Sequence, residues 1–202
     1  IRFEIVKRAA EHGAGTVKDG TGLCPFPDCR RTIEGDEIKA QAQADGMGHQ
    51  LYAVVYKKQV EVAGKSGKPR RKMERGFRAR RPEDDIDDLI AAKLAEKMPE
   101  WAARNIVPDE RFPEDANDTR PIQYGAPLWR DLFSPRQLFG HCTSVEVFHD
   151  LVAELEEANG GKLPDLERAS LVYLAFALDK LLNYNTLQVR WIPQREVVAS
   201  TF

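Results

Sequence analysis

The chain has 202 residues, of which 42% are hydrophobic and 31% charged, and its formal net charge is -2. This near balance of charge excludes a uniformly basic nucleic-acid binder and an acidic tail, and no apolar run approaches the roughly 18 residues of a membrane-spanning helix. We therefore expect a cytoplasmic globular protein without a membrane segment, folded as one large domain or two small ones.

The amino-terminal part of the chain, residues 1–80, is predicted to be β-rich. Ile1, Phe3 and Ile5 alternate with charged residues, and this period of two predicts a half-buried strand over residues 1–6. Residues 16–18 could form a second, short strand, and residues 34–43 a short helix or an irregular strand. Because the first strand pattern begins without an initiator methionine, we interpret the chain as a segment of a longer protein.

Two cysteines in this part suggest a metal site. Cys24 and Cys29 are separated by four residues, two of them proline, in the sequence LCPFPDC. Such a turn can direct both sulfurs at one ion, and zinc favours four tetrahedral ligands that are often thiolates. Cys142 lies far along the chain, and the four histidines show no ligand spacing relative to the pair. We predict half of a zinc ribbon that binds metal through Cys24 and Cys29; the alternative is two reduced cysteines in a turn.

A basic β-hairpin is predicted next. Residues 51–62 form a β-branched and aromatic run, the sequence GKSGKP supplies a turn, and the chain returns through Met73 and Phe77. Eleven Lys or Arg residues and two Glu lie between Lys57 and Arg81, and such cations can bind backbone phosphates. The residues predicted to bind nucleic acid are Lys68, Arg70, Arg71 and Lys72. The alternative is a solvated hairpin, since no aromatic residues for base stacking are interleaved with the charges.

The carboxy-terminal part, residues 81–202, is predicted to be helical. Pro82 and the acidic residues after it begin a helix that should end before Pro99. Residues 99–133 are rich in proline and predict an extended connector outside the core. The neighbouring carboxylates of this connector are interpreted as solvated side chains rather than as catalytic groups.

The longest helix begins after this connector. Ser134 is the expected N-cap, Pro135 the first helical residue and Gln137 the partner that completes a capping box. Apolar residues then keep a helical spacing to about Ala158, with Cys142 among them as a small buried hydrophobic side chain.

A third helix begins at Pro164, and its sequence LVYLAFALDKLL is apolar on nearly every side. We expect it to be the central helix of a small bundle, flanked by the other two. The predicted fold class is therefore α+β, with a small β-rich, zinc-ribbon-like part and a basic hairpin followed by a helical bundle.

Three separated blocks carry a resemblance to a known family. They are LCPFPDCRRTIEGDEIKAQAQADGMGHQLYAVVYK, YGAPLWRDLFSPRQL and YLAFALDKLLNYNT. In this order they resemble the middle of the large bacterial and archaeal adenine-specific DNA methylases that contain a zinc ribbon. The resemblance implies a parent protein that transfers a methyl group from S-adenosylmethionine to adenine in DNA, often encoded beside phage-defence or helicase genes.

The resemblance also implies which motifs lie outside this chain. Such enzymes have a cofactor loop, Asp-Pro-Phe-x-Gly-x-Gly, and a catalytic loop, Asp-Pro-Pro-Tyr. Neither motif occurs in this sequence. Asn183, Tyr184 and Asn185 lack the prolines of the catalytic loop, so no catalytic or cofactor-binding residue is assigned. We expect a segment that is inactive alone and positions DNA or a partner. The alternative is a non-catalytic protein-interaction module of a phage-defence or helicase-associated complex.

Overall fold

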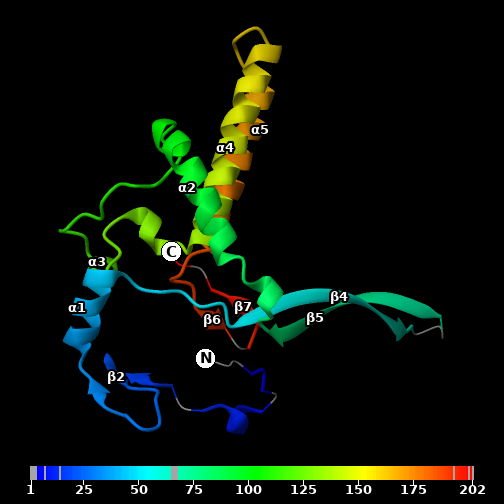
Figure 1. The fold of residues 1–202 in the computed structure, drawn as a ribbon. Coiled ribbons are helices and arrows are strands. Elements are labelled where there is room, and N and C mark those ends of the chain that lie inside the picture. The colour runs from blue at the N-terminus through cyan, green and yellow to red at the C-terminus, as the bar shows by residue number, and fades with distance from the viewer. Residues whose placement is uncertain are drawn as a thin grey trace. The chain divides into compact units, whose positions relative to one another are not determined.

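The computed structural model describes residues 4–6, 8–13, 15–64, 68–192, 194–199 and 201. The chain divides into two compact units, and Figure 1 labels most of their helices and strands. The strand unit comprises Ile1–Gly35 and Gly48–Ile86, and the helical unit comprises Asp36–Met47 and Asp87–Phe202. Helices together with small antiparallel sheets confirm the predicted α+β class, while the zinc ribbon stays a prediction.

The strand unit contains two antiparallel sheets. β1 (Val17–Lys18), β2 (Thr21–Leu23) and β3 (Thr32–Ile33) form the first, which confirms the short strand expected at residues 16–18. β4 (Ala53–Ala63) and β5 (Pro69–Ala79) form the expected hairpin. Two 3-10 helices, η1 (Ala9–Glu11) and η2 (Pro82–Asp84), also belong to this unit. Of the strand expected over residues 1–6, residues 1–3 lie outside the described residues and residues 4–6 are not in a strand.

The helical unit begins with α1, which confirms the helical alternative for residues 34–43. Its elements in chain order are α1 (Gly35–Asp45), α2 (Asp87–Ala103), α3 (Arg120–Gln123), η3 (Trp129–Leu132), α4 (Pro135–Ala158), α5 (Asp165–Leu182), β6 (Trp191–Ile192) and β7 (Val197–Val198). Among the described residues, no helix is both long and apolar enough to span a bilayer.

α1 docks on the loop that follows α3. Ala42 is buried, and its carbonyl lies so close to Gly125 that a side chain at position 125 would collide with it. The Gln43 side-chain amide donates a hydrogen bond to the Gln123 carbonyl at 3.1 Å. Gly125 has a φ of 78°, a conformation that glycine adopts without strain. This contact explains why α1 belongs to the helical unit although strand-unit residues flank it in the sequence.

α2 continues past Pro99, contrary to the helix end expected there. The helix begins at Asp87, after η2, and extends to Ala103. Proline has no N–H to donate to the preceding turn and destabilises a helix interior. Trp101 in the next turn is 0% exposed, however, and packs on Phe139 of α4 with ring centroids 5.6 Å apart. Burial of the indole offsets the lost hydrogen bond, so tertiary packing overrides the local stop signal.

α2 and α4 run in the same direction, which explains the long connection between them. Three ion pairs join corresponding positions: Asp87 with Arg136 at 3.7 Å, Lys97 with Glu146 at 2.8 Å and Arg104 with Asp150 at 2.6 Å. Antiparallel neighbouring helices need only a short loop, whereas a parallel pair needs a chain that returns along the length of the first helix. Residues 104–134 provide that return.

The returning chain is part of the core, which differs from the extended connector that we expected. Ile106, Val107, Phe112 and Leu132 are buried. The ring of Phe112 packs on Trp129 with centroids 4.1 Å apart. The prolines prevent a long helix here, but the apolar residues between them still pack against the helices.

The start of α4 confirms the predicted capping box. The Ser134 hydroxyl accepts a hydrogen bond from the Gln137 N–H at 3.4 Å, and the Gln137 side chain accepts one from the Ser134 N–H at 2.9 Å. Pro135 is the first helical residue, and the helix ends at Ala158 as expected. Cys142 is 1% exposed, and burial raises the pKa of its thiol to about 11. Its role as a buried apolar side chain is confirmed.

The expected central position of α5 is wrong, because α4 lies between the other two long helices. α2 and α5 each pack on α4, and α4 and α5 run side by side in Figure 1. Leu171 is the buried residue of α5, while Tyr173 and Phe176 are 76% and 62% exposed. The number of apolar residues in α5 therefore exceeds what α4 covers.

Candidate nucleic-acid interface

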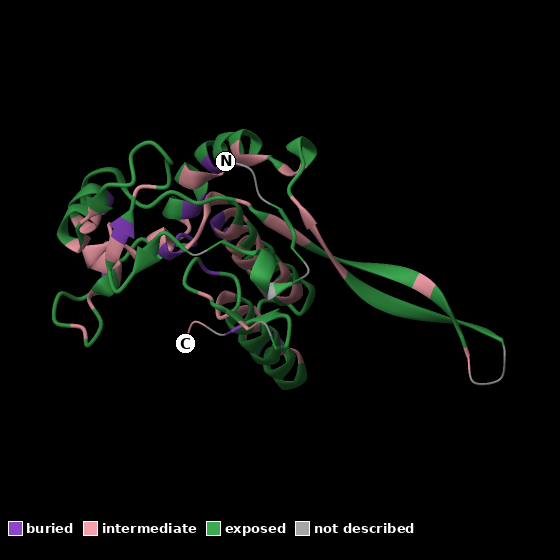
Figure 2. Cartoon of the chain, turned by 90° about the horizontal axis from the view of Figure 1, so that it is seen from below, coloured by how far each residue is buried: buried purple, intermediate pink, exposed green. Residues whose placement is uncertain are grey.

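The hairpin of β4 and β5 forms a two-stranded antiparallel sheet, which we call the ribbon. Among the strands of the described residues, these two pair only with each other, in register from Ala53 with Ala79 to Ala63 with Pro69. Figure 2 shows the outer part of the twisted ribbon coloured mostly as exposed and its inner end as intermediate. Polar side chains on both faces suit this exposure, because a solvated sheet face carries no core residues. The ribbon therefore presents its charges to solvent on both sides.

The register assigns every ribbon residue to one of two faces. Directly paired residues point to the same side of a sheet, and successive residues alternate. Each pair joins two even-numbered or two odd-numbered residues, for example Lys58 with Glu74 and Lys57 with Arg75. We call the side of the even-numbered residues the even face and the other the odd face.

The predicted nucleic-acid-binding residues are divided between these faces. Arg70 and Lys72 lie on the even face, opposite Val62 and Val60. Arg71 lies on the odd face, opposite Glu61, and Lys68 is an exposed residue just before β5. The structure thus brings all four to the outer part of one ribbon, but it does not bring them to one face.

Further cations of the ribbon were not among the predicted binding residues, and two of them face each other. Lys57 and Arg75 lie directly opposite each other on the odd face. Both side chains are exposed, so this face of the ribbon presents positive charge to solvent. The sequence signal that could have revealed this pair is the alternation of residues on both sides of the predicted turn GKSGKP. The even face therefore carries Arg70 next to Lys72, and the odd face carries Lys57 opposite Arg75. Lys58 on the even face and Arg71 on the odd face each lie opposite a glutamate.

An ion-pair network holds the inner end of the ribbon. Both terminal nitrogens of Arg78 donate to the Asp84 carboxylate, at 2.5 and 2.7 Å, and the Arg81 N–H donates to it at 2.8 Å. These donors, Arg78 first, hold the pKa of Asp84 well below its usual range. Arg80 pairs with Asp85 at 2.6 Å beside this network. A bidentate pair of this kind fixes orientation as well as distance.

Tyr56 covers the only glycine in β5. Its ring lies over Gly76, directly across the ribbon, with its hydroxyl oxygen 2.6 Å from where a Cβ of residue 76 would stand. An aromatic ring packed over a strand glycine shields the backbone there and stabilises the pair. Tyr56 is thus part of the ribbon's own packing, and no other aromatic residue occurs between Lys57 and Arg75.

The cysteine pair lies in the turn between β2 and β3. The Cys24 N–H donates to the Arg31 carbonyl at 2.9 Å, and the N–H groups of Cys29 and Arg30 both donate to the Phe26 carbonyl, at 3.0 and 3.2 Å. Arg30 has a φ of 48°, which reverses the chain after the second cysteine. This closed turn brings the two thiols into contact with each other.

Local hydrogen bonds favour the thiolate form of Cys29. The Arg31 backbone N–H donates to its sulfur, and together with a hydrogen bond from Cys24 this lowers the pKa of the Cys29 thiol. Metal ligation requires the thiolate. Among the described residues, however, no three or more Cys, His, Asp or Glu side chains converge on one point. Zinc binding by Cys24 and Cys29 therefore stays a prediction, and the described residues do not add further ligands to the pair.

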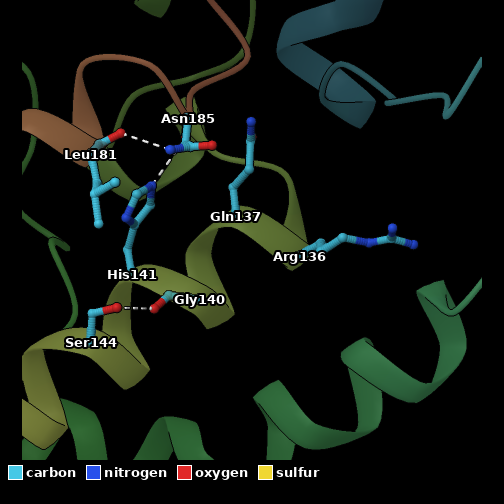
Figure 3. A pocket seen from close by; sticks show the side chains of 7 residues that line it. All are labelled: Arg136, Gln137, Gly140, His141, Ser144, Leu181 and Asn185. Atoms are coloured by element: carbon cyan, nitrogen blue, oxygen red, sulfur yellow. Dashed lines mark hydrogen bonds between the residues drawn. The ribbon is translucent and has the colours of Figure 1, made fainter. Parts of the chain in front are cut away.

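A shallow pocket of about 340 Å³ lies in the helical unit, between the first turns of α4 and the end of α5 (Figure 3). The His141 ring bonds the Asn185 carbonyl at 3.1 Å, which implies that its Nε2 carries the proton. The Ser144 hydroxyl donates to the Gly140 carbonyl at 2.8 Å, and the Asn185 amide donates to the Leu181 carbonyl at 3.0 Å. The Ser144 bond lies within α4, and the His141 bond joins α4 to the chain after α5, so these contacts do not form a nucleophile and base.

Comparisons of the chain with protein-family models, with curated proteins and with solved structures find no match. They identify no family, so the resemblance to adenine-specific DNA methylases stays a prediction. The geometry of the ribbon is therefore the main basis for assigning a function.

Proposed function

We propose that this chain is a DNA-positioning segment of an S-adenosylmethionine-dependent, adenine-specific DNA methyltransferase whose chemistry lies outside the chain. The exposed ribbon with cations on both faces is the observation that carries the DNA-binding part of this proposal. The three sequence blocks support the methyltransferase part. Cys24 and Cys29 would hold zinc together with two ligands from elsewhere in the parent protein.

The ribbon suits a nucleic-acid backbone for electrostatic and steric reasons. Exposed Lys and Arg side chains bind phosphates and release condensed counterions, so that affinity falls steeply with salt. The strongly charged strands also resist pairing with the edge of another protein's sheet. The Arg78–Asp84 pair joins the inner end of the ribbon to η2 within the strand unit.

A binding assay with matched variants tests this proposal. Fluorescence anisotropy of a labelled DNA duplex measures affinity between about 50 and about 200 mM salt. We expect Arg70→Ala/Lys72→Ala to weaken binding by about tenfold or more and to reduce the slope of log affinity against log salt by about two. Lys93→Ala/Lys162→Ala removes the same charge from exposed positions of the helical unit and serves as the control. Equal effects of the two variants, or no binding by the wild-type chain, would refute DNA positioning by the ribbon.

Calorimetric titration with S-adenosylmethionine tests where the chemistry lies. The chain lacks the glycine-rich cofactor loop, so no heat of binding is expected. Clear micromolar binding would contradict the placement of the cofactor site outside this chain. Metal analysis of the intact parent, with and without Cys24→Ser/Cys29→Ser, tests the zinc part, and an unchanged zinc content in the variant would exclude this pair as ligands.

A second candidate function is that of a protein-interaction module in a helicase-associated or phage-defence complex. The exposed apolar side chains on α5 favour it: Leu166, Tyr173 and Phe176 lie on the side of the helix away from the buried Leu171. Tyr173→Glu/Phe176→Glu should abolish capture of a protein partner and leave DNA affinity unchanged. Retention of the partner by this variant would remove the support that α5 gives to this candidate.

A further inference from the structure

The distribution of cations over the ribbon identifies how it would engage nucleic acid. A ribbon that lies flat on a polyanion needs cations on one face only. Here Arg70 and Lys72 lie on the even face, and Lys57 and Arg75 lie on the odd face. Both pairs are exposed. Charge on both faces suits a ribbon that stands between two rows of phosphates.

We propose that the ribbon enters the major groove of duplex DNA edge-on, with its even face toward one phosphate wall and its odd face toward the other. This inference rests on the proposed function, since it names the form of DNA and the binding mode. Duplex DNA presents two phosphate rows that border each groove, whereas a single strand presents one. The division of cations between faces therefore favours a duplex.

The dimensions of the ribbon agree with the major groove. Packed sheets lie about 10 Å apart, which is the thickness of one sheet with the side chains of its faces. The major groove of B-DNA is about 12 Å wide and admits a two-stranded ribbon, whereas the minor groove is only about 6 Å wide. The part of the ribbon from Lys57 to Ala63 has a length of about 20 Å at the usual rise per residue. This length exceeds the width of the major groove, so the ribbon can extend along the groove.

The absence of aromatic residues argues against a single-stranded ligand. Proteins that bind single strands without sequence preference stack bases on exposed aromatic side chains. Residues 57–75 contain no Phe, Trp, Tyr or His, and the neighbouring Tyr56 lies over Gly76. The ribbon therefore offers cations for phosphates but no aromatic surface on which unpaired bases could stack. This combination suits a duplex.

Charge-neutral variants of each face test the binding mode. The even-face variant is Arg70→Ala/Lys72→Ala, the odd-face variant is Lys57→Ala/Arg75→Ala, and the control is Lys93→Ala/Lys162→Ala. With the labelled duplex, each face variant should reduce the salt slope by about two and weaken binding by about tenfold or more. The control should bind nearly as well as the wild type. Unchanged circular dichroism and melting temperature of each variant exclude unfolding as the cause.

The outcomes separate this inference from the proposed function. If only one face variant loses affinity, the ribbon lies flat and edge-on insertion is wrong, while DNA binding by the ribbon stands. If the wild-type chain binds no DNA, both proposals fail. Saturation of an A·T-rich duplex with netropsin, which occupies the minor groove, should weaken binding only modestly, through the positive charge of netropsin itself. Loss of binding in its presence, or tighter binding to a single strand than to the duplex, would overturn the major-groove assignment.

Discussion

Trp101 should be the largest single contributor to the stability of the helical unit. Its side chain is 0% exposed and contacts Phe139 across the α2–α4 interface. A tryptophan buries about 200 Å², which corresponds to about 5 kcal/mol at 25 cal/mol per Å². Because this figure is an upper bound and large-to-small substitutions at buried aromatic positions cost about 3–5 kcal/mol, we expect Trp101→Ala to lower the free energy of unfolding by about 4 kcal/mol.

Urea unfolding followed by far-UV circular dichroism measures this loss. Trp101→Phe keeps an aromatic ring against Phe139 and should cost less than half as much as the alanine variant. Tyr173→Ala is the control, since its ring is 76% exposed and its removal should change stability by no more than about 0.5 kcal/mol. A loss below about 1 kcal/mol for Trp101→Ala would refute the argument that burial of the indole carries α2 past Pro99.

Three further substitutions test local features. Ser134→Ala removes the N-cap acceptor of α4 and should cost about 1 kcal/mol in urea unfolding; an unchanged midpoint would show that the cap adds nothing. Gly125→Ala should destabilise the helical unit by more than about 1 kcal/mol, because φ is 78° and the methyl group meets the Ala42 carbonyl; wild-type stability would contradict this contact. Asp84→Asn should lower the melting temperature at neutral pH. The pKa of Asp84 is depressed in the folded chain by Arg78, so its stabilisation is complete above the unfolded value of about 3.9 and is lost as the pH falls below it. The melting temperatures of variant and wild type should therefore converge in acid, and a gap that widens below about pH 4 would oppose this assignment.

Features encoded by nearby residues could be predicted from the sequence. The capping box at Ser134 depends on residues three positions apart, and the hairpin of β4 and β5 depends on strand patterns about one turn. The turn around Cys24 and Cys29 is likewise local. These elements were recognised because the interactions that form them involve residues close together in the chain.

Features that depend on distant partners could not be predicted in the same way. The continuation of α2 through Pro99 requires Phe139, which lies 40 residues beyond Pro99. The apolar sequence of α5 indicates burial, but it cannot show that α4 covers one side only. For the candidate site, composition identified the basic hairpin, whereas the division of its cations into two faces required the strand register.

The docking of α1 has a consequence for how the chain folds during synthesis. The Gln43 side chain bonds the carbonyl of Gln123, 80 residues later. At translation rates of about 5–20 residues per second, α1 leaves the ribosome about 4–16 seconds before its docking site. A helix of 11 residues is marginally stable alone in water. α1 is therefore expected to remain largely unfolded until the loop at Gly125 emerges, with the whole basic ribbon synthesised in the interval.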